Sequence, residues 1–319
     1  MKNLKTGFAT VVLAAAMFGT FAQAQTFHRI GTGGTAGTYY PVGGMVANII
    51  SVPNKLIATA AASNGSLGNM NSIIGGSLES GFSQSDIATW LYTGTGIAEG
   101  RPKATDLRMI ANLYPESVHL VVRKGAGVTK VADLKGKRVS LDEPGSGTLI
   151  NAKIILAAYG VKEADIKPEY LKPNQAGDKL KDGALDAFFF TGGAPAGAIV
   201  ELASSGAGIE ILNIDGPEAE GLRMFSPFFA VDTIAAETYK GVGAVKTLAL
   251  GAQWVTSTKV DNDTIYNMVK ALYSAEGQKL MATGHAKGKF VTRANAVKGV
   301  GIPFHPGAEK YYREMGLIK

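Results

Sequence analysis

The chain has 319 residues, of which 46% are hydrophobic and 18% are charged, and it contains 41 glycines and no cysteine. This composition excludes a disordered or coiled-coil protein, because nearly half of the residues can be buried. The lack of cysteine excludes disulfides, thiolate catalysis, iron–sulfur clusters and Cys-ligated zinc. A formal net charge of +6, scattered along the chain, does not indicate nucleic-acid binding.

The first 24 residues have the pattern of a secretory signal peptide. Lys2 and Lys5 precede an uncharged run over residues 7–21, and the Ala-Gln-Ala sequence at 22–24 provides a cleavage site. A membrane anchor is less favoured, because it needs about 20 continuous apolar residues. We therefore expect cleavage after Ala24 and a periplasmic location. The remaining chain is long enough for two domains.

Short β-rich runs alternate with segments of helical periodicity over the rest of the chain. The expected strands cover residues 28–30, 56–60, 109–113, 119–122, 138–141, 187–190 and 210–212. Apolar residues recur at helical spacing after Pro41 and within residues 150–158 and 196–203. This alternation predicts an α/β fold with mostly parallel sheets, in which ligands bind beyond the carboxyl ends of the strands.

Five segments at expected strand-to-helix junctions are rich in Gly, Ser, Thr, Asn or Gln. They cover residues 31–41, 62–66, 83–86, 143–148 and 191–195. Free backbone N–H groups at helix N-termini, together with hydroxyl and amide side chains, bind anions without a formal positive charge. One such segment is an ordinary cap or turn, but five of them indicate a binding site.

The placement of acidic residues favours an anionic ligand at the first two of these segments. No Asp or Glu occurs over residues 25–78, and the first acid of the chain is Glu79. A negatively charged ligand would therefore meet little electrostatic repulsion there.

Motifs of nucleotide-binding proteins and serine hydrolases are incomplete. The sequence Gly31-x-Gly33-x-x-Ala36 resembles a dinucleotide fingerprint, but the acid expected about 20 residues later is missing. No P-loop occurs, and no serine lies in Gly-x-Ser-x-Gly. We expect neither catalytic residues nor a cofactor.

Metal sites are not favoured either. The four histidines lack His-x-x-x-His spacing. Glu116 and His119 lie three apart in a β-rich run, where that spacing points their side chains to opposite faces. The Asp-Asn-Asp sequence at 261–263 lacks the rest of a calcium loop and is interpreted as a turn and helix cap.

Several motifs in chain order carry a family resemblance. They are residues 31–41 (GTGGTAGTYYP), 84–86 (QSD), 113–123 (LYPESVHLVVR), 133–139 (DLKGKRV), 144–148 (PGSGT), 186–189 (DAFF), 302–308 (IPFHPGA) and 311–314 (YYRE). Together they resemble the TAXI family, the extracytoplasmic solute receptors of TRAP transporters. Ala36 replaces a frequent Gly, and Ser83 replaces a frequent apolar residue.

The resemblance implies a two-domain, periplasmic binding protein-like fold of type II, with the ligand cleft between the domains. Carried onto this chain, the first domain would comprise residues 25–122 and 224–319, and the second residues 123–223. The crossings would fall near residues 121–124 and 213–225. Three of the polar segments would then face the other two across the cleft.

The resemblance also implies that the protein binds a small carboxylate such as glutamate, glutamine or a 2-oxoglutarate-like acid. None of the five segments contains Arg, so backbone N–H, hydroxyl and amide donors must hold the carboxylate. The expected ligand-binding residues are Gly34, Thr35, Thr38, Tyr39, Gly65, Ser66, Gln84, Ser146, Gly147, Thr148, Thr191, Gly192 and Gly193. Tyr114 and His119 are interpreted as hinge packing, with ligand contact as the alternative.

The function expected from this reading is capture of the solute by domain closure and delivery to a membrane-embedded TRAP permease, by a monomer without enzymatic activity. Two alternatives remain open at this point. One is a binding protein of an ATP-driven importer or a sensor for a small anion. The other, less favoured, is an enzyme on a binding-protein fold, which would need a perturbed acid in the cleft.

Overall fold

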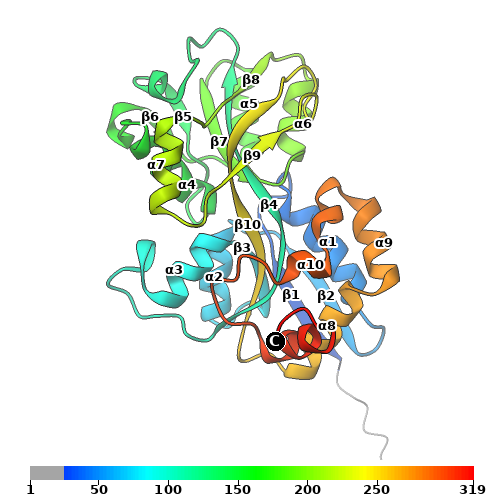
Figure 1. Ribbon diagram of the computed structural model, residues 1–319. Helices are drawn as coiled ribbons and strands as arrows, with labels where there is room; N and C mark the ends of the chain where they lie inside the picture. Colours follow the sequence, from blue (N-terminus) through cyan, green and yellow to red (C-terminus); the bar gives the residue numbers. More distant parts are fainter. Residues whose placement is uncertain (1–24) are drawn as a thin grey trace, which may run out of the picture.

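The computed structural model describes residues 25–319, which form two lobes that share one ten-stranded sheet (Figure 1). The expected signal peptide, residues 1–24, lies outside the described residues, and so does the expected cleavage. Over residues 25–319, no helix is long and apolar enough to cross a membrane.

The lower lobe in Figure 1 is built on three parallel strands, β1 (Thr26–Gly31), β2 (Leu56–Ala61) and β3 (Ser80–Gln84). β1 lies between the other two and pairs in parallel with both. The helices of this lobe are α1 (Tyr39–Ile50), α2 (Ser66–Ile74), α3 (Ser85–Thr93), α8 (Asn262–Leu272), α9 (Ala275–Gly284), α10 (Arg293–Ala296) and α11 (Pro306–Glu314), with 3₁₀ turns η1 (Gly96–Ala98) and η4 (Ala286–Phe290).

The upper lobe also contains a parallel group of strands, β5 (Arg138–Ser140), β6 (Lys167–Glu169) and β7 (Ala187–Gly192). β5 lies between β6 and β7. The other elements of this lobe are β8 (Ile209–Leu212), the helices α4 (Gly147–Ala158), α5 (Pro173–Lys181), α6 (Gly197–Ser204) and α7 (Pro217–Phe225), and the 3₁₀ turns η2 (Val131–Leu134) and η3 (Glu163–Asp165).

Two long strands, β4 (Leu107–Arg123) and β10 (Val245–Ser257), run antiparallel to each other through both lobes (Figure 1). In the lower lobe β10 pairs with β3. In the upper lobe β4 pairs with β7 and β8, and β10 pairs with β9 (Ala230–Ile234). The expected parallel pairing therefore occurs in the outer parts of the sheet, and the antiparallel pair connects them.

The second crossing between the lobes differs from the expected one. The sequence predicts a return to the first domain near Met224, but Phe229 and Leu248 still pack in the core of the upper lobe. The chain returns within β10 instead. The reason is that β9 pairs with the first half of β10 and extends the upper lobe, and neither strand is among those expected from the sequence.

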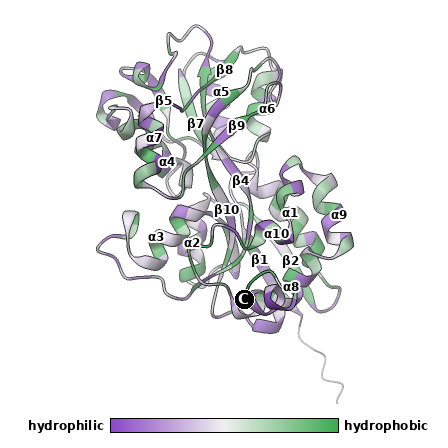
Figure 2. Cartoon of the chain, viewed as in Figure 1, coloured by the Kyte–Doolittle hydropathy of each residue, from purple (hydrophilic) through white to green (hydrophobic). Residues whose placement is uncertain are grey.

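Apolar residues concentrate on the strands and on the helix faces that cover them (Figure 2). The helix expected after Pro41 is α1, and its residues Val42, Val46 and Ile50 are buried in the core of the lower lobe. Asp261 caps α8 by accepting a hydrogen bond from the backbone N of Thr264, as the cap interpretation predicts.

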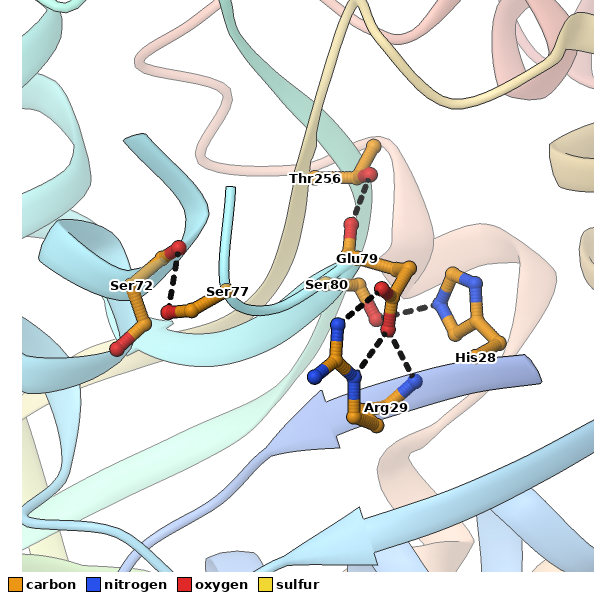
Figure 3. Close-up of polar contacts among 7 residues, drawn as sticks. All are labelled: His28, Arg29, Ser72, Ser77, Glu79, Ser80 and Thr256. Carbon is orange, nitrogen blue, oxygen red and sulfur yellow. Dashed lines mark hydrogen bonds and ion pairs between the residues drawn. The ribbon is translucent and has the colours of Figure 1, made fainter. Parts of the chain in front are cut away.

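Figure 3 shows how β1 is connected to the start of β3. The Arg29 guanidinium donates from Nη2 to Glu79 Oε1 at 2.6 Å and from Nε to Glu79 Oε2 at 3.0 Å. Beside this pair, His28 Nε2 lies 2.7 Å from Ser80 Oγ in a buried contact. Glu79, the first acid of the chain, therefore links β1 to the residue that precedes β3.

A hydrogen-bonded chain of buried groups joins β4 to the start of α6. His119 Nδ1 lies 2.9 Å from the carbonyl oxygen of Ser117 and 3.2 Å from that of Phe190, so Nδ1 carries the proton and donates. His119 Nε2 then accepts from the Tyr239 hydroxyl at 2.9 Å, and that hydroxyl accepts from the backbone N of Ala196 at 3.0 Å. These contacts hold His119 in place within the upper lobe, and its role as hinge packing stays a prediction.

Removing the Tyr239 hydroxyl should destabilise the protein. In Tyr239→Phe the Ala196 N–H and His119 Nε2 lose their common partner while remaining buried, so we expect the free energy of unfolding to fall by about 1–3 kcal/mol. Urea unfolding measures this difference. Tyr40→Phe is the matched control, because Tyr40 is exposed. Equal stability of Tyr239→Phe and the wild type would contradict the assignment.

Candidate ligand-binding site

A cavity of about 480 Å³, its open mouth included, lies between the two lobes. We call it the interlobe cavity. Both lobes contribute to its lining. The lining residues include ones at or just after the carboxyl ends of β1, β2, β3, β5 and β7, where an α/β sheet is expected to bind ligands. The lining residues are Gly33, Gly34, Gly37, Thr38, Tyr39, Asn64, Gly65, Ser66, Gln84, Glu116, Asp142, Glu143, Ser146, Gly147, Thr148, Pro173, Phe190, Thr191 and Gly192.

Four helices begin at the interlobe cavity. Tyr39 starts α1, Ser66 starts α2, Gly147 starts α4 and Pro173 starts α5. The caps of α1 and α2 make no side-chain hydrogen bond to their first turns, whereas Ser146 caps α4 by accepting from the backbone N of Leu149. Backbone N–H groups at the start of α1 and α2 therefore remain available to an acceptor on a ligand.

Direct contacts close the two lobes on each other around the cavity. The backbone N of Gly68 in α2 donates to the carbonyl oxygen of Gly145 in the loop before α4, at 3.0 Å. The Thr38 hydroxyl donates to the carbonyl oxygen of Gly193 at 2.5 Å. These hydrogen bonds exist only while the lobes are together, so the structure represents the closed arrangement.

A buried carboxyl group takes part in this closure. Asp86, at the start of α3, accepts a hydrogen bond from Asn151 Nδ2 of α4 at 2.9 Å. Burial raises the pKa of Asp86 to about 6, against the lowering effect of hydrogen bonds from the Ile87 backbone and from Asn151. Asp86 is not among the lining residues, so it connects the lobes behind the cavity.

Two buried polar atoms at the cavity have no partner among the described residues. They are Gln84 Oε1 and Thr191 Oγ1. Gln84 is 2% exposed and Thr191 is 6% exposed. A buried polar atom that stays unpaired costs about 1–3 kcal/mol, so both are positions where a ligand would supply the missing hydrogen bond.

Gln84 depends on a glycine in the opposite lobe. A Cβ atom at Gly147 would lie 2.0 Å from Gln84 Oε1 and 2.9 Å from Ser66 Oγ. Only glycine leaves room for these two side chains when the lobes are closed. This close approach is the structural reason for Gly147 in the predicted 143–148 segment.

Three carboxyl side chains line the interlobe cavity, and the sequence reasoning missed all of them as site residues. They are Glu116 from β4 and the neighbours Asp142 and Glu143 from the loop before α4. Within the described chain, no Lys, Arg or His lines the cavity. The absence of acidic residues from the first two polar segments therefore does not extend to the whole site.

Glu116 is buried, and its environment favours the neutral form. The Tyr39 hydroxyl donates to Glu116 Oε2 at 2.8 Å. Burial raises the pKa of Glu116 to about 8; the Tyr39 hydrogen bond opposes this rise and the charge of Asp86 adds to it. A carboxyl group in this state exchanges its proton near neutral pH, so its charge responds to what binds beside it.

Burial also raises the pKa values of the other two acids, Asp142 and Glu143. Burial raises the pKa of Asp142 to about 7, and hydrogen bonds from Glu143 N and the Thr148 hydroxyl oppose the rise. Burial also raises the pKa of Glu143, but Lys172 Nζ lies 3.6 Å from its Oε2 and opposes the shift. Glu143 is thus the one of these three acids that forms an ion pair with a lysine.

The structure brings together most of the residues that the sequence singled out. All of them except Thr35 and Gly193 line the interlobe cavity. Thr35 is exposed on the segment before α1 and does not reach the cavity, because that segment turns its Gly33, Gly34 and Gly37 inward instead. Gly193 is buried behind the lining and contributes its carbonyl oxygen to Thr38.

Neither Tyr114 nor His119 lines the cavity, and both pack in the cores next to the hinge. Glu116 could have been noticed from its position in the TAXI-like motif between them, where a strand carries a lone acid. Among the described residues, no group of three or more His, Cys, Asp or Glu side chains is arranged to hold a metal ion.

Comparisons with known proteins place the chain among others of similar fold. A model of the NMT1-like family matches residues 30–316. A solved protein from Bordetella bronchiseptica RB50 is 19% identical over 92% of this chain and 82% of its own, with a TM-score of 0.55. The alkanesulfonate-binding protein SsuA from Xanthomonas axonopodis pv. citri, bound to MOPS, is 18% identical over 91% and 84%, with a TM-score of 0.46.

An ancestral arginine-binding protein bound to arginine is also similar, at 17% identity over 83% of this chain and 97% of its own, with a TM-score of 0.48. At such identities the likeness concerns the fold. The expected α/β fold, with a largely parallel arrangement of strands in each lobe and helices that flank the sheet, is confirmed.

Glu116 should make stability depend on pH. Its pKa is raised in the folded protein from 4.5 to about 8, so its contribution is fully present below about pH 4.5 and is lost as pH rises toward 8. Glu116→Gln stays neutral, and we expect it to exceed the wild type in stability at pH 8.5 by on the order of 2 kcal/mol, with a much smaller difference at pH 5.

Thermal unfolding of both proteins from pH 5 to pH 9 measures this effect. Glu201→Gln is the control, because Glu201 is exposed on α6 and its substitution should leave the difference from wild type independent of pH. A Glu116→Gln effect of the same size at every pH would show that Glu116 is ionised in the folded protein.

Proposed function

This chain belongs to the NMT1-like family, and we propose that it is a solute-binding receptor that captures a small carboxylate between its lobes and delivers it to a membrane transporter. The observation that carries the proposal is the interlobe cavity. It is lined from both lobes and contains buried polar atoms that lack partners within residues 25–319. A cavity of that kind gains hydrogen bonds when a polar ligand fills it.

The proposed ligand is a small acid such as glutamate, glutamine or 2-oxoglutarate. Its carboxylate would accept hydrogen bonds from backbone N–H groups at the start of α1 and α2 and from hydroxyl donors such as Ser66 and Thr191. Each hydrogen bond to a charged group contributes about 1.5–3 kcal/mol. Several of them are enough for micromolar binding, which requires about 8 kcal/mol after the cost of ordering.

Closure follows from the division of the site between the lobes. A ligand that contacts Ser66 of α2 and Thr148 of α4 together binds the closed form better than the open one. That difference in affinity shifts the population toward closure. The direct contact between Gly68 and Gly145 then adds to the stability of the closed form.

We also propose that the receptor is exported to the periplasm and serves a permease of the TRAP type. The signal-peptide pattern of residues 1–24 supports export. The resemblance of the 31–41, 144–148 and 302–308 motifs to the TAXI family supports the type of permease. In this role the protein performs no chemistry, and the cavity acids serve binding.

A thermal-shift screen tests the proposal. We expect L-glutamate, L-glutamine or 2-oxoglutarate to raise the unfolding temperature of the wild type, since a ligand at one hundred times its Kd stabilises by about 2.7 kcal/mol. Gln84→Ala should lose most of that shift, because it removes a buried amide side chain from the lining of the cavity. Thr35→Ala, on the same lobe but outside the cavity, should retain it. Equal shifts in both variants would discard the site.

A further inference from the structure

The acids and the unpartnered amide oxygen of the interlobe cavity are all hydrogen-bond acceptors when the acids are ionised. A carboxylate-only ligand brings further acceptors and no donor to them. The Glu116 side chain makes one hydrogen bond, in which Oε2 accepts from Tyr39, and its Oε1 has no hydrogen-bond partner among the described residues. Gln84 Oε1 likewise lacks a donor. A donor on the ligand would pair both atoms and would favour the ionised form of Glu116.

The charge balance around Glu116 indicates what kind of donor this is. The ionisable groups that face it are Tyr39 on α1, Tyr114 on β4, Asp86 on α3 and Lys287 on η4. Lys287 is the one cation of this set, and within the described chain it makes no ion pair with Glu116. An ionised Glu116 therefore feels the more distant charge of Lys287 but has no direct ion pair until a ligand brings one.

We infer that Glu116 is the residue by which the interlobe cavity selects a solute that carries a protonated amine beside its carboxylate. The inference rests on the proposed function and narrows its solute class from small carboxylates to amino acids. The ammonium group donates to Glu116 and forms the direct ion pair that its carboxylate lacks. The carboxylate of the same solute is held by the helix N-termini, which carry no acid of their own.

The corresponding oxo acid is the discriminating analogue. 2-Oxoglutarate has the carbon skeleton of L-glutamate but a carbonyl oxygen in place of the amine, so it presents an acceptor where Glu116 needs a donor. A site built to hydrogen-bond a polar group rejects an analogue that lacks it, because its own buried groups are then left unpaired. We expect the wild type to bind L-glutamate on the order of tenfold to hundredfold more tightly than 2-oxoglutarate.

Isothermal titration of the wild type and Glu116→Gln with both acids at pH 7.5 tests the inference. Glu116→Gln keeps the size and the Tyr39 contact but cannot carry the charge. We expect it to lose on the order of thirtyfold in affinity for L-glutamate and less than about threefold for 2-oxoglutarate. Thr35→Ala is the control and should match the wild type for both acids.

The outcomes separate the inference from the proposed function. If the wild type binds both acids equally well, or if Glu116→Gln weakens both to the same extent, the amine selectivity of Glu116 is refuted and the receptor function stands. If the wild type binds L-glutamine but neither of the two acids, and Glu116→Gln abolishes that binding, the inference holds with a different side chain on the solute. If the wild type binds none of the three, the proposed function fails and the inference fails with it.

The proton balance of binding gives a second measurement that a purely structural role would not change. A solute amine stabilises ionised Glu116, so binding releases a proton, and the affinity for L-glutamate should rise between pH 6.5 and pH 8.5. Asp142 also lines the cavity, and Asp142→Asn shows how much of the release it contributes. Titrations in two buffers of different ionisation enthalpy count the protons. Proton uptake by the wild type, or unchanged release in Glu116→Gln, would overturn the inference.

Discussion

The antiparallel pairing of β4 with β10 is the constraint on which the rest of the structure depends. Both strands pass from one lobe to the other, so the lobes are held side by side while the loops at the strand ends face each other. The interlobe cavity is the space between those loops, and Glu116 lies on β4 at the crossing, paired with Leu250 of β10. One connection thus determines where the lobes meet, which polar loops face each other and where a buried acid is placed between them.

The loops of the cavity were predictable from sequence because their chemistry is local. Gly147 has no side chain and so leaves room for Gln84, and a glycine of this kind is visible in the sequence. The helix starts at Tyr39 and Ser66 are likewise indicated by the residues next to them. Strand β3 and the second crossing between the lobes were not predictable in the same way. β3 has the sequence SGFSQ, with little β-propensity, and is strand-like only because it is buried between β1 and β10. The β9–β10 pair, which moves the return from Met224 into β10, depends on contacts distant in sequence.

The acids of the cavity illustrate the same limit for function. Glu143 lies inside a segment that the sequence marks as polar and glycine-rich, and Glu116 stands out in the sequence only by its spacing from His119. In the fold these two side chains separate: Glu116 reaches the cavity and His119 turns to Tyr239 in the hinge. Alternation along a strand predicts that separation, but which of the two faces meets the cavity is decided by packing. The number of acids in the site therefore follows from the packing of the two lobes and not from the local sequence.

Hydrogen exchange on the wild type, with and without L-glutamate, tests most directly whether the two lobes close on a solute. Amide protection reports the stability of each segment separately, and ligand contacts from both lobes stabilise both. We predict slower exchange at residues 64–69 of the lower lobe and at residues 143–149 of the upper lobe, with β6 of the upper lobe and α11 of the lower lobe unchanged. Protection confined to one lobe, or located away from the interlobe cavity, would contradict capture between the lobes.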